Sequence, residues 1–237
     1  MKKQLVYDFP TRAFHWLFAS LFLSAFAIAK LLDSDSQYYS YHMMAGLTLS
    51  FAVSLRVFWG FVGTRHARFQ NFVLKPKFLM EYFKGIVRNE KVRWSGHNPA
   101  SSWAALLMMF FGLGLGTTGF MMASGGDKEV LEEIHEVLAN SFFIVACAHV
   151  LGIALHTLRF KDLIGLSMVT GKKENVPDEE AISLPRTGLG IIFVSLVFAF
   201  SIHLLKNFDT ETKRLKIFGF PIQLGETAKN DNHGEDD

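Results

Sequence analysis

The chain has 237 residues, 50% of them hydrophobic and 14% aromatic, with a formal net charge of +2 and one cysteine. A single cysteine, Cys147, excludes an intrachain disulfide, and the sequence has no C-x-x-C-H motif for covalent haem attachment. The distribution of apolar and charged residues is more informative than these totals.

The apolar residues form five long blocks. Each has about 18–25 residues, and about 20 residues of helix at 1.5 Å per residue cross the hydrocarbon of a bilayer. Spans must be helices or closed barrels, and these runs lack the alternation of barrel strands. We therefore predict an all-α, multi-pass transmembrane helical bundle. In chain order, the blocks cover residues 13–32, 43–63, 103–123, 134–158 and 187–205.

Basic and acidic connections alternate between the blocks. The N-terminus, the loop over residues 64–100 and the loop after the fourth block are rich in Lys and Arg, whereas the loops over 33–41 and 124–133 are acidic. Cytoplasmic loops carry the excess of Lys and Arg. We therefore place the protein in the bacterial inner membrane, with the N-terminus cytoplasmic and the C-terminus periplasmic. Membrane orientation explains the basic loops, so we expect no nucleic-acid partner.

Three segments outside the blocks have their own character. Residues 78–89, "FLMEYFKGIVRN", have apolar residues at helical spacing, which predicts an amphipathic helix at the membrane interface. Residues 174–186 form a polar segment that we expect to be a cytoplasmic linker before the fifth transmembrane helix. Residues 206–237 are mostly polar, and we expect a mobile periplasmic tail.

Four histidines in the spans pair by depth. His135 and His149 are 14 residues apart, which puts them within about 40° of the same helix face and about 21 Å apart along it. The alternating directions of the helices place His42 at the outer level of His135, and His15 at the inner level of His149. Two facing imidazoles are the axial ligands of a low-spin haem b. We therefore expect two bis-histidine haems, because neutral imidazoles bound to iron need no charge in lipid.

Other residues in the spans suit the same cofactors. Arg56 follows His42 by 14 residues, and we expect it to pair with a propionate of the inner haem; the alternative is that it snorkels to the interface. Gly46 would let the outer haem approach the helix backbone, although helix packing explains it equally well. The G-x-x-x-G of Gly112 and Gly116 fits close helix packing or room for a macrocycle.

The remaining histidines give weaker signals. His156 lies seven residues past His149, on nearly the same face. We expect it to contact a propionate or to lie at the interface, with replacement of His149 as a ligand as the alternative. His66, His97 and His233 lie outside the spans, and we expect them to be solvated.

Four stretches of the sequence resemble the bacterial cytochrome b561 family, which includes the b-type cytochrome subunit of nickel–iron hydrogenase. They are "YDFPTRAFHW", "YHMMAGLTL", "GHNPASS" and "IHEVLANSFFIVACAHVLGIALHTLRFKDLIGLSMVTGKK". The similarity covers about residues 5–173. It implies a four-helix di-haem core within residues 1–173, followed by a fifth helix that the common core lacks. The ligand positions of the family fall on His15, His42, His135 and His149.

The resemblance also implies cofactor contacts and a role. The family's arginine in the second helix falls on Arg56, and Arg12 opens the R-x-x-H-W motif, so both are expected to contact the cofactors with Gly46 and His156. The implied role is electron transfer in a respiratory chain between quinone or quinol and a partner redox protein. That partner would be a c-type cytochrome, a dehydrogenase or a hydrogenase. The protein would act as an electron-transfer subunit or as a quinol–cytochrome oxidoreductase.

Three alternatives stay open at this point. A stand-alone membrane oxidoreductase would act on a small oxidant at the outer haem. A passive membrane anchor would hold its haems only for structure. A proton-coupled transporter would use the histidines as a relay.

Overall fold

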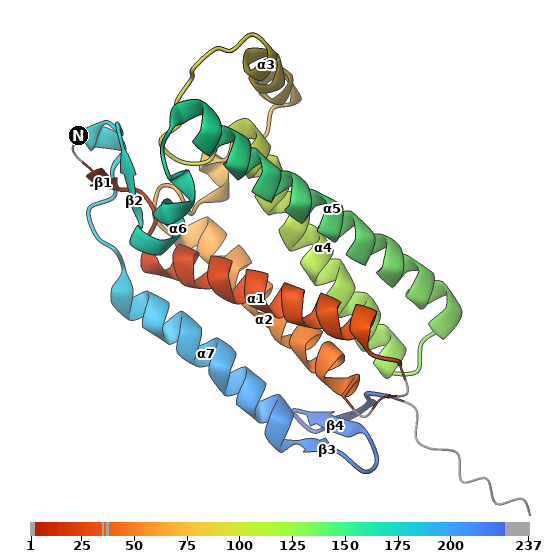
Figure 1. Cartoon of the computed structure of the whole chain (residues 1–237). Coiled ribbons are helices and arrows are strands. Elements are labelled where there is room, and N and C mark those ends of the chain that lie inside the picture. The colour runs from red at the N-terminus through yellow and green to blue at the C-terminus, as the bar shows by residue number, and fades with distance from the viewer. Residues whose placement is uncertain (1–2, 35, 37, 226–237) are drawn as a thin grey trace, which may run out of the picture.

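All five apolar blocks are long helices in the computed structural model, which describes residues 3–34, 36 and 38–225 (Figure 1). Each is long and apolar enough to cross a membrane, so the prediction of an all-α, multi-pass bundle is confirmed. The five helices are α1 (Phe9–Leu31), α2 (Ser40–Val62), α4 (Pro99–Ala123), α5 (Lys128–Phe160) and α7 (Thr187–Lys206).

Four of these helices begin before the predicted apolar blocks, and in three of them a polar side chain caps the first turn. The caps of α1, α4 and α5 accept hydrogen bonds from the free backbone N–H groups of the first turn, which stabilises a helix start. Hydropathy detects only the apolar residues that follow, so the predicted starts fall inside the helices. The accepting residues are Asp8, Asn98 and Asp127.

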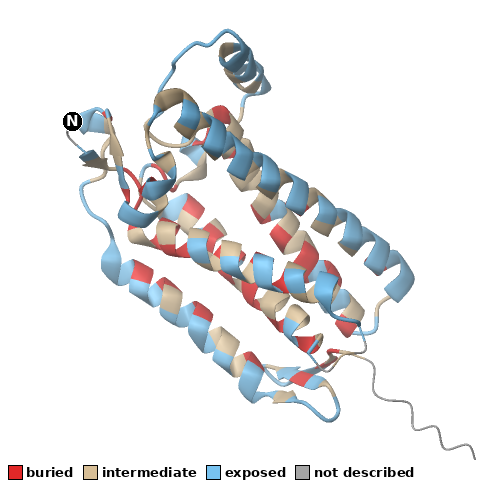
Figure 2. Cartoon of the chain, viewed as in Figure 1, coloured by how far each residue is buried: buried red, intermediate tan, exposed pale blue. Residues whose placement is uncertain are grey.

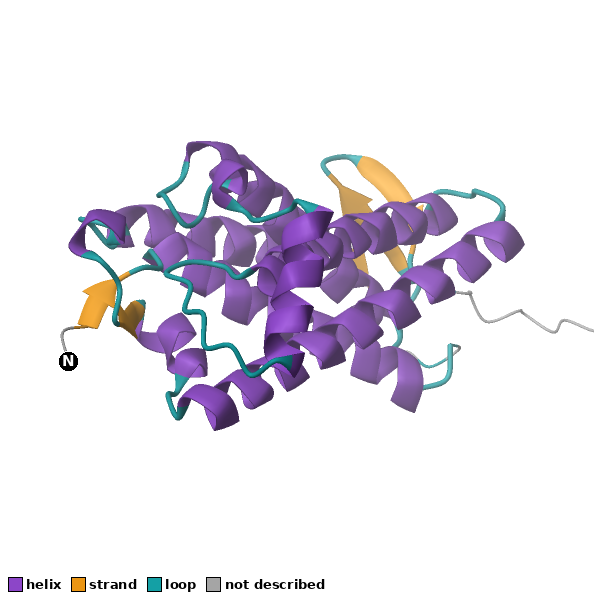
Figure 3. Ribbon diagram, turned by 90° about the horizontal axis from the view of Figure 1, so that it is seen from above, coloured by secondary structure: helices purple, strands orange, loops and turns teal. Residues whose placement is uncertain are grey.

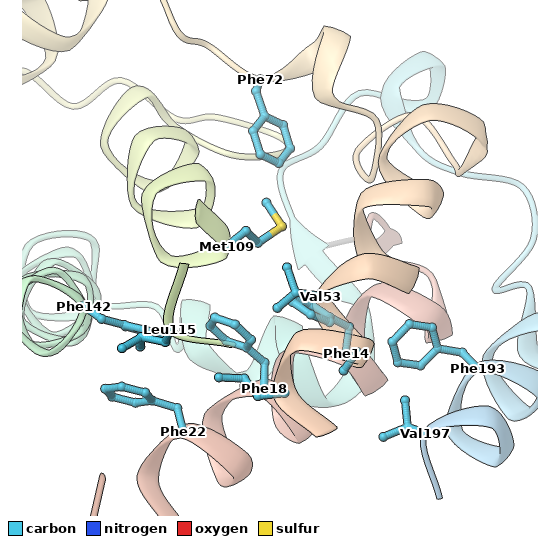
Figure 4. Close-up of a cluster of buried hydrophobic side chains, with 12 residues drawn as sticks. Phe14, Phe18, Phe22, Val53, Phe72, Met109, Leu115, Phe142, Phe193 and Val197 are labelled. Atoms are coloured by element: carbon cyan, nitrogen blue, oxygen red, sulfur yellow. The ribbon is translucent and has the colours of Figure 1, made fainter. Parts of the chain in front are cut away.

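The helices pack in a sequential arrangement. α1 packs against α2, α2 against α4, and α4 against α5, while α7 packs against α1 and α2 on the far side from α5 (Figures 1 and 3). The main core is rich in aromatic residues from several helices (Figure 4). Most side chains of α5 are exposed, as Figure 2 shows, which suits a helix that faces lipid.

The basic loops gather at one end of the bundle, which we call the N-terminal end. Here β1 (Lys3–Leu5) pairs antiparallel with β2 (Lys172–Glu174), which joins the start of the chain to the segment after α5. The predicted amphipathic helix is confirmed as α3 (Pro76–Val87), which packs chiefly against α4 and exposes much of its apolar face. The other short helices are η1 (Phe69–Asn71), η2 (Ile164–Leu166), α6 (Ser167–Thr170) and η3 (Asp178–Glu180).

The opposite end of the bundle carries a small sheet where we expected a mobile tail. Its antiparallel strands, in the order β3-β4-β5, are β3 (Phe208–Asp209), β4 (Arg214–Ile217) and β5 (Phe220–Gln223). The expectation is wrong for these residues because a few apolar side chains in a mostly polar stretch reach the core. Those buried side chains are Leu215, Ile222 and Leu224, which pack with Met44 and Leu204. Residues 226–237, including His233, lie outside the described residues.

Small residues let α2 and α4 approach closely. A Cβ atom added to Gly116 would overlap the Ser50 side chain of α2, whereas one added to Gly188, near the start of α7, meets no atom within 4 Å. The G-x-x-x-G segment therefore serves helix packing at Gly116.

We predict that Gly116→Ala lowers the free energy of unfolding by about 1–3 kcal/mol, because the added methyl group forces a shift at a packed interface. Gly188→Ala is the control, and its expected effect is neutral or stabilising by up to about 1 kcal/mol, since alanine favours helix. Denaturant unfolding of both variants in one detergent measures the difference. Equal stability of the two variants would contradict this account of the packing.

Candidate cofactor site

His42 of α2 and His135 of α5 face each other in the half of the bundle away from the N-terminal end. Their ring centres are 6.1 Å apart and their ring planes meet at 68°. Two metal–imidazole bonds of about 2.0 Å, plus about 1 Å from each nitrogen to its ring centre, place two axial imidazoles about 6 Å apart. The observed separation therefore fits one iron between the two rings.

Hydrogen bonds at Nδ1 set the tautomers of both rings. His42 Nδ1 lies 2.8 Å from the carbonyl oxygen of Ala25, which can only accept, so Nδ1 carries the proton. His135 Nδ1 lies 2.8 Å from the hydroxyl oxygen of Thr118, and that hydroxyl donates its own proton to the carbonyl oxygen of Gly114. His135 Nδ1 therefore donates as well. Both rings are left with an unprotonated Nε2, the form of imidazole that binds a metal.

His15 of α1 and His149 of α5 form a second group nearer the N-terminal end. They lie near enough for a charge on one ring to act on the other. Nδ1 of His15 is buried and has no hydrogen-bond partner, and the ring of Trp16 meets the His15 ring edge-on at 5.2 Å. This level is separated from the first by about 21 Å of helix rise along α5.

An aromatic layer lies between the two histidine levels. Phe142 stands midway between His135 and His149 in the sequence and is 1% exposed. Its ring stacks on the ring of Phe22 of α1, with ring centres 3.8 Å apart. The ring of Phe18 also stacks on it, with ring centres 5.3 Å apart (Figure 4). The three rings join α1 to α5 and fill the interior between the levels.

Arg56 of α2 is buried at the inner level, with 3% of its surface exposed. Its Nη2 donates to the carbonyl oxygen of Ala67 at 2.9 Å, whereas its Nη1 is buried without a partner. The guanidinium lies over the rings of Phe14 and Phe69, at 5.9 and 5.4 Å from their centres. A buried donor with no acceptor is costly. The burial does not fit a snorkelling side chain, and an anionic oxygen would satisfy Nη1.

Arg12 and Gly46, two other residues expected to contact the cofactors, have different surroundings. Arg12 donates from Nη1 to the carbonyl oxygen of Val169, and its Nε is buried without a partner. A Cβ atom added to Gly46 would meet no atom within 4 Å, so there is open space beside its Cα atom.

His156 contacts a carboxylate at the end of α5. Its Nε2 lies 3.3 Å from Oδ1 of Asp162, and its ring stacks on Phe160 with ring centres 4.4 Å apart. Arg93 donates to the other oxygen of the same carboxylate. His156 therefore lies beside the Arg93–Asp162 ion pair at the end of α5.

The expectation that His66 and His97 are solvated is wrong. His66 is 7% exposed, and its Nε2 donates to the carbonyl oxygen of Glu180 at 2.7 Å. The His97 ring packs against Phe72 and Tyr7, with ring centres 4.7 and 5.6 Å apart. Sequence position could not show this, because the loop that precedes α4 folds back over the end of the bundle.

Positive charges of two neighbouring side chains act on His97. Burial lowers the pKa of His97 well below its ordinary value, and the positive charges of Lys173 and Arg56 lower it further. Lys173 donates from Nζ to the carbonyl oxygen of Gly96 at 2.9 Å, and burial lowers the pKa of Lys173 to about 8. The N-terminal end of the interior therefore presents positive charge beside a neutral imidazole, a setting that favours an anion.

The described residues contain no group of three or more His, Cys, Asp or Glu side chains placed to hold a metal ion. Tetrahedral zinc sites need three or four such protein ligands. Histidines from separate helices instead lie in groups of two, His42 with His135 and His15 with His149. Such pairs suit a metal whose remaining ligands come from a macrocycle.

Comparison with known proteins identifies related sequences over the same part of the chain. The family described as "Prokaryotic cytochrome b561" matches residues 6–171, well over half of the chain. This range contains α1, α2, α4 and α5 and all four paired histidines, whereas α7 and the small sheet lie beyond it. No solved structure matches the chain significantly.

Curated relatives carry consistent names. The chain is 34% identical over 144 residues to the "Probable Ni/Fe-hydrogenase B-type cytochrome subunit" of Rhodobacter capsulatus, which is 51% of this chain and 52% of the relative. It is 26% identical over 144 residues to the "Probable Ni/Fe-hydrogenase 1 B-type cytochrome subunit" of Escherichia coli (strain K12), covering 50% of this chain and 60% of the relative. The matches thus span little more than half the length of these relatives.

The buried position of His97 predicts acid sensitivity. Its folded pKa is below its unfolded value of about 6.5, so the unfolded chain binds a proton first as the pH falls. The free energy of unfolding should therefore decrease below about pH 6.5. We expect wild-type protein to lose about 1–2 kcal/mol more than His97→Asn between pH 7 and pH 5.

Denaturant midpoints at pH 7, 6 and 5 in one detergent measure this difference. The slope with pH should be shallower for His97→Asn because the variant lacks this proton uptake. Parallel curves for the two proteins would show that His97 titrates alike in the folded and unfolded chains.

Proposed function

The chain belongs to the prokaryotic cytochrome b561 family, and on that premise we propose that it is a di-haem b-type cytochrome that transfers electrons between quinone and a partner redox protein. A membrane haem b protein with an electron-transfer role follows from the family and the five apolar helices. The number of haems, their ligands, the quinone and the partner are the parts that we propose.

The proposal depends chiefly on the geometry of His42 and His135. Their ring separation of 6.1 Å fits an iron between them, and both Nδ1 atoms are engaged so that both Nε2 atoms are available. His149, 14 residues after His135 on α5, would hold the second haem together with His15 of α1. When bound, each haem supplies an iron that takes up and releases one electron.

Other residues of the chain would position the two groups. Arg56 would donate from Nη1 to a propionate of the inner haem, with the charge of Lys173 nearby. Arg12 would contribute a second cation at the same level. Gly46 leaves open space on α2 one turn from His42, where the edge of the outer haem would lie. His156 is already paired with Asp162 and is not needed as a ligand.

The two levels divide a path across the bilayer into short steps. The histidine levels are about 21 Å apart along α5, and the rings of Phe18, Phe22 and Phe142 fill the interior between them. This packing excludes water and lipid from the region between the levels. Electrons therefore move through a fixed, low-dielectric interior rather than a solvated one.

The proposed substrate and partner follow from the orientation and from the relatives. We place the N-terminal end in the cytoplasm, because it carries the basic loops. Oxidation of one quinol releases two electrons and two protons, so one-electron carriers must accept the electrons in succession. The relatives are named as cytochrome subunits of Ni/Fe-hydrogenases, which supports a hydrogenase or a similar metalloprotein as the partner.

Single substitutions test the ligand assignment. Wild-type protein should contain two haems b per chain, and His15→Leu, His149→Leu, His42→Leu and His135→Leu should each contain about one. His203→Leu, on α7, is the matched control and should retain both. The pyridine haemochrome assay, normalised to protein, gives the ratios. Full haem content in both His15→Leu and His135→Leu would refute the assignment.

Arg56 should raise the reduction potential of one haem, because a cation disfavours the more positive oxidised form. We expect Arg56→Gln to lower that midpoint potential by roughly 50–100 mV, since a nearby charge in a partly buried site acts with about 2 kcal/mol. Arg56→Lys keeps the charge and should recover most of the shift. Arg65→Gln, an exposed arginine at the same end, is the control. Unchanged potentials in a spectroscopic redox titration of Arg56→Gln would place its charge away from both haems.

Reduction by quinol tests the function itself. In lipid nanodiscs, a short-chain quinol analogue should reduce the haem within minutes of mixing, without any partner protein. The b-type absorption bands report this reduction. Dithionite gives the full extent of reduction for comparison. Bands that respond to dithionite and stay oxidised with quinol would favour a passive anchor, and a protein without a Soret band would favour the histidine-relay transporter.

A further inference from the structure

The small sheet beyond the family's common core ends in an exposed aromatic turn. We propose that Phe218, Gly219 and Phe220, which we call the aromatic tip, enter the interface of the bilayer that the chain itself spans. The tip would thereby anchor the sheet and the end of α7 to the lipid. This inference does not depend on the haems.

The position of the tip along α7 gives its depth. The Phe218 ring stacks on the His203 ring, with ring centres 4.8 Å apart and planes at 16°, and lies 6.4 Å from the Phe200 ring. Phe200 is six residues before the end of α7 at Lys206, or about 9 Å along the helix. The tip therefore lies back along α7 and does not extend past its end.

The length of α7 places its end at the surface of the membrane. A helix of 20 residues is about 30 Å long, which is about the thickness of the hydrocarbon. Its last turns must lie at the boundary between hydrocarbon and headgroups. Side chains that stack on those turns from outside the bundle lie at the same boundary.

The tip is also continuous with a surface that faces lipid. Leu196, one turn before Phe200 on the same face of α7, is 44% exposed, and Phe218 and Phe220 are each 73% exposed. Large aromatic side chains gain from removal from water. Together these residues form one apolar surface that begins on a membrane-spanning helix and continues onto the sheet.

The turn itself does not require aromatic residues. Ile217 pairs with Phe220, so Phe218 and Gly219 form a two-residue hairpin loop, with φ values of 49° and 93°. Loops with both residues at positive φ favour Asn-Gly or Asp-Gly, and a bulky side chain at the first position is uncommon. The phenylalanine is therefore present despite the turn geometry, which points to a role for its apolar surface.

The other turn of the sheet has the opposite character. Between β3 and β4, Oδ1 of Asp209 accepts hydrogen bonds from the backbone N–H groups of Glu211 and Thr212. Thr210 is exposed. A polar turn of this kind is typical of a surface in contact with water. The sheet thus presents a polar turn and an apolar tip, as a segment at the edge of a bilayer requires.

Spin-label accessibility tests the proposal on the whole haem-loaded protein in phospholipid nanodiscs. Cys147→Ser removes the one native cysteine, and Phe218→Cys, Phe220→Cys and Thr210→Cys are each added to it and labelled with a nitroxide. Haem content per chain shows that each variant is folded. Collision rates with oxygen, which concentrates in lipid, and with a water-soluble nickel chelate are measured for each label.

We expect the ratio of oxygen to nickel accessibility to be at least several-fold higher at positions 218 and 220 than at position 210. If labels at 218 and 220 are as accessible to nickel as the label at 210, the tip lies in water and the proposal is wrong. The tip would then be free to contact a partner protein instead. If Phe218→Cys distorts the turn and lowers haem content, the label at position 220 alone decides between the two outcomes.

Discussion

Polar groups in hydrocarbon must find partners within the protein or its cofactors, because lipid offers none. This constraint organises the interior of the bundle. The Nδ1 atoms of His42 and His135 form hydrogen bonds with Ala25 and Thr118, which leaves one nitrogen on each ring for a metal. The guanidinium of Arg56 is only partly hydrogen-bonded, since Nη2 has a partner and Nη1 has none. Nη1 of Arg56 is a buried donor that a propionate oxygen would satisfy.

The same constraint explains the spacing of polar residues along the helices. On α5, His135 and His149 flank Phe142, and on α2, His42 and Arg56 flank Leu49, with seven residues at each step. Two turns of helix return a side chain to nearly the same face. Each helix therefore presents polar groups at two levels and a buried apolar side chain between them. The result is two levels of polar side chains with a packed layer of Phe18, Phe22 and Phe142 between them.

Sequence reasoning predicted the parts of the fold that long-range periodicity and hydropathy encode. The five spans, the amphipathic helix predicted over residues 78–89 and the meeting of His42 with His135 all follow from apolar length and helix geometry. The sheet at residues 208–223 was missed because its core contacts rest on isolated residues such as Leu215 and Ile222. The burial of His66 and His97 was missed because it depends on loops that fold over the end of the bundle, which no local pattern records.

We propose that imidazoles from separate helices bind an iron at each of two levels of the bundle. Near-infrared magnetic circular dichroism of the oxidised wild-type protein, combined with its iron content, tests this most directly, because the charge-transfer band of low-spin ferric haem identifies its axial ligands. We expect two irons per chain, both with bis-imidazole ligation. One iron per chain, or a band that shows a methionine or an open axial position, would contradict it.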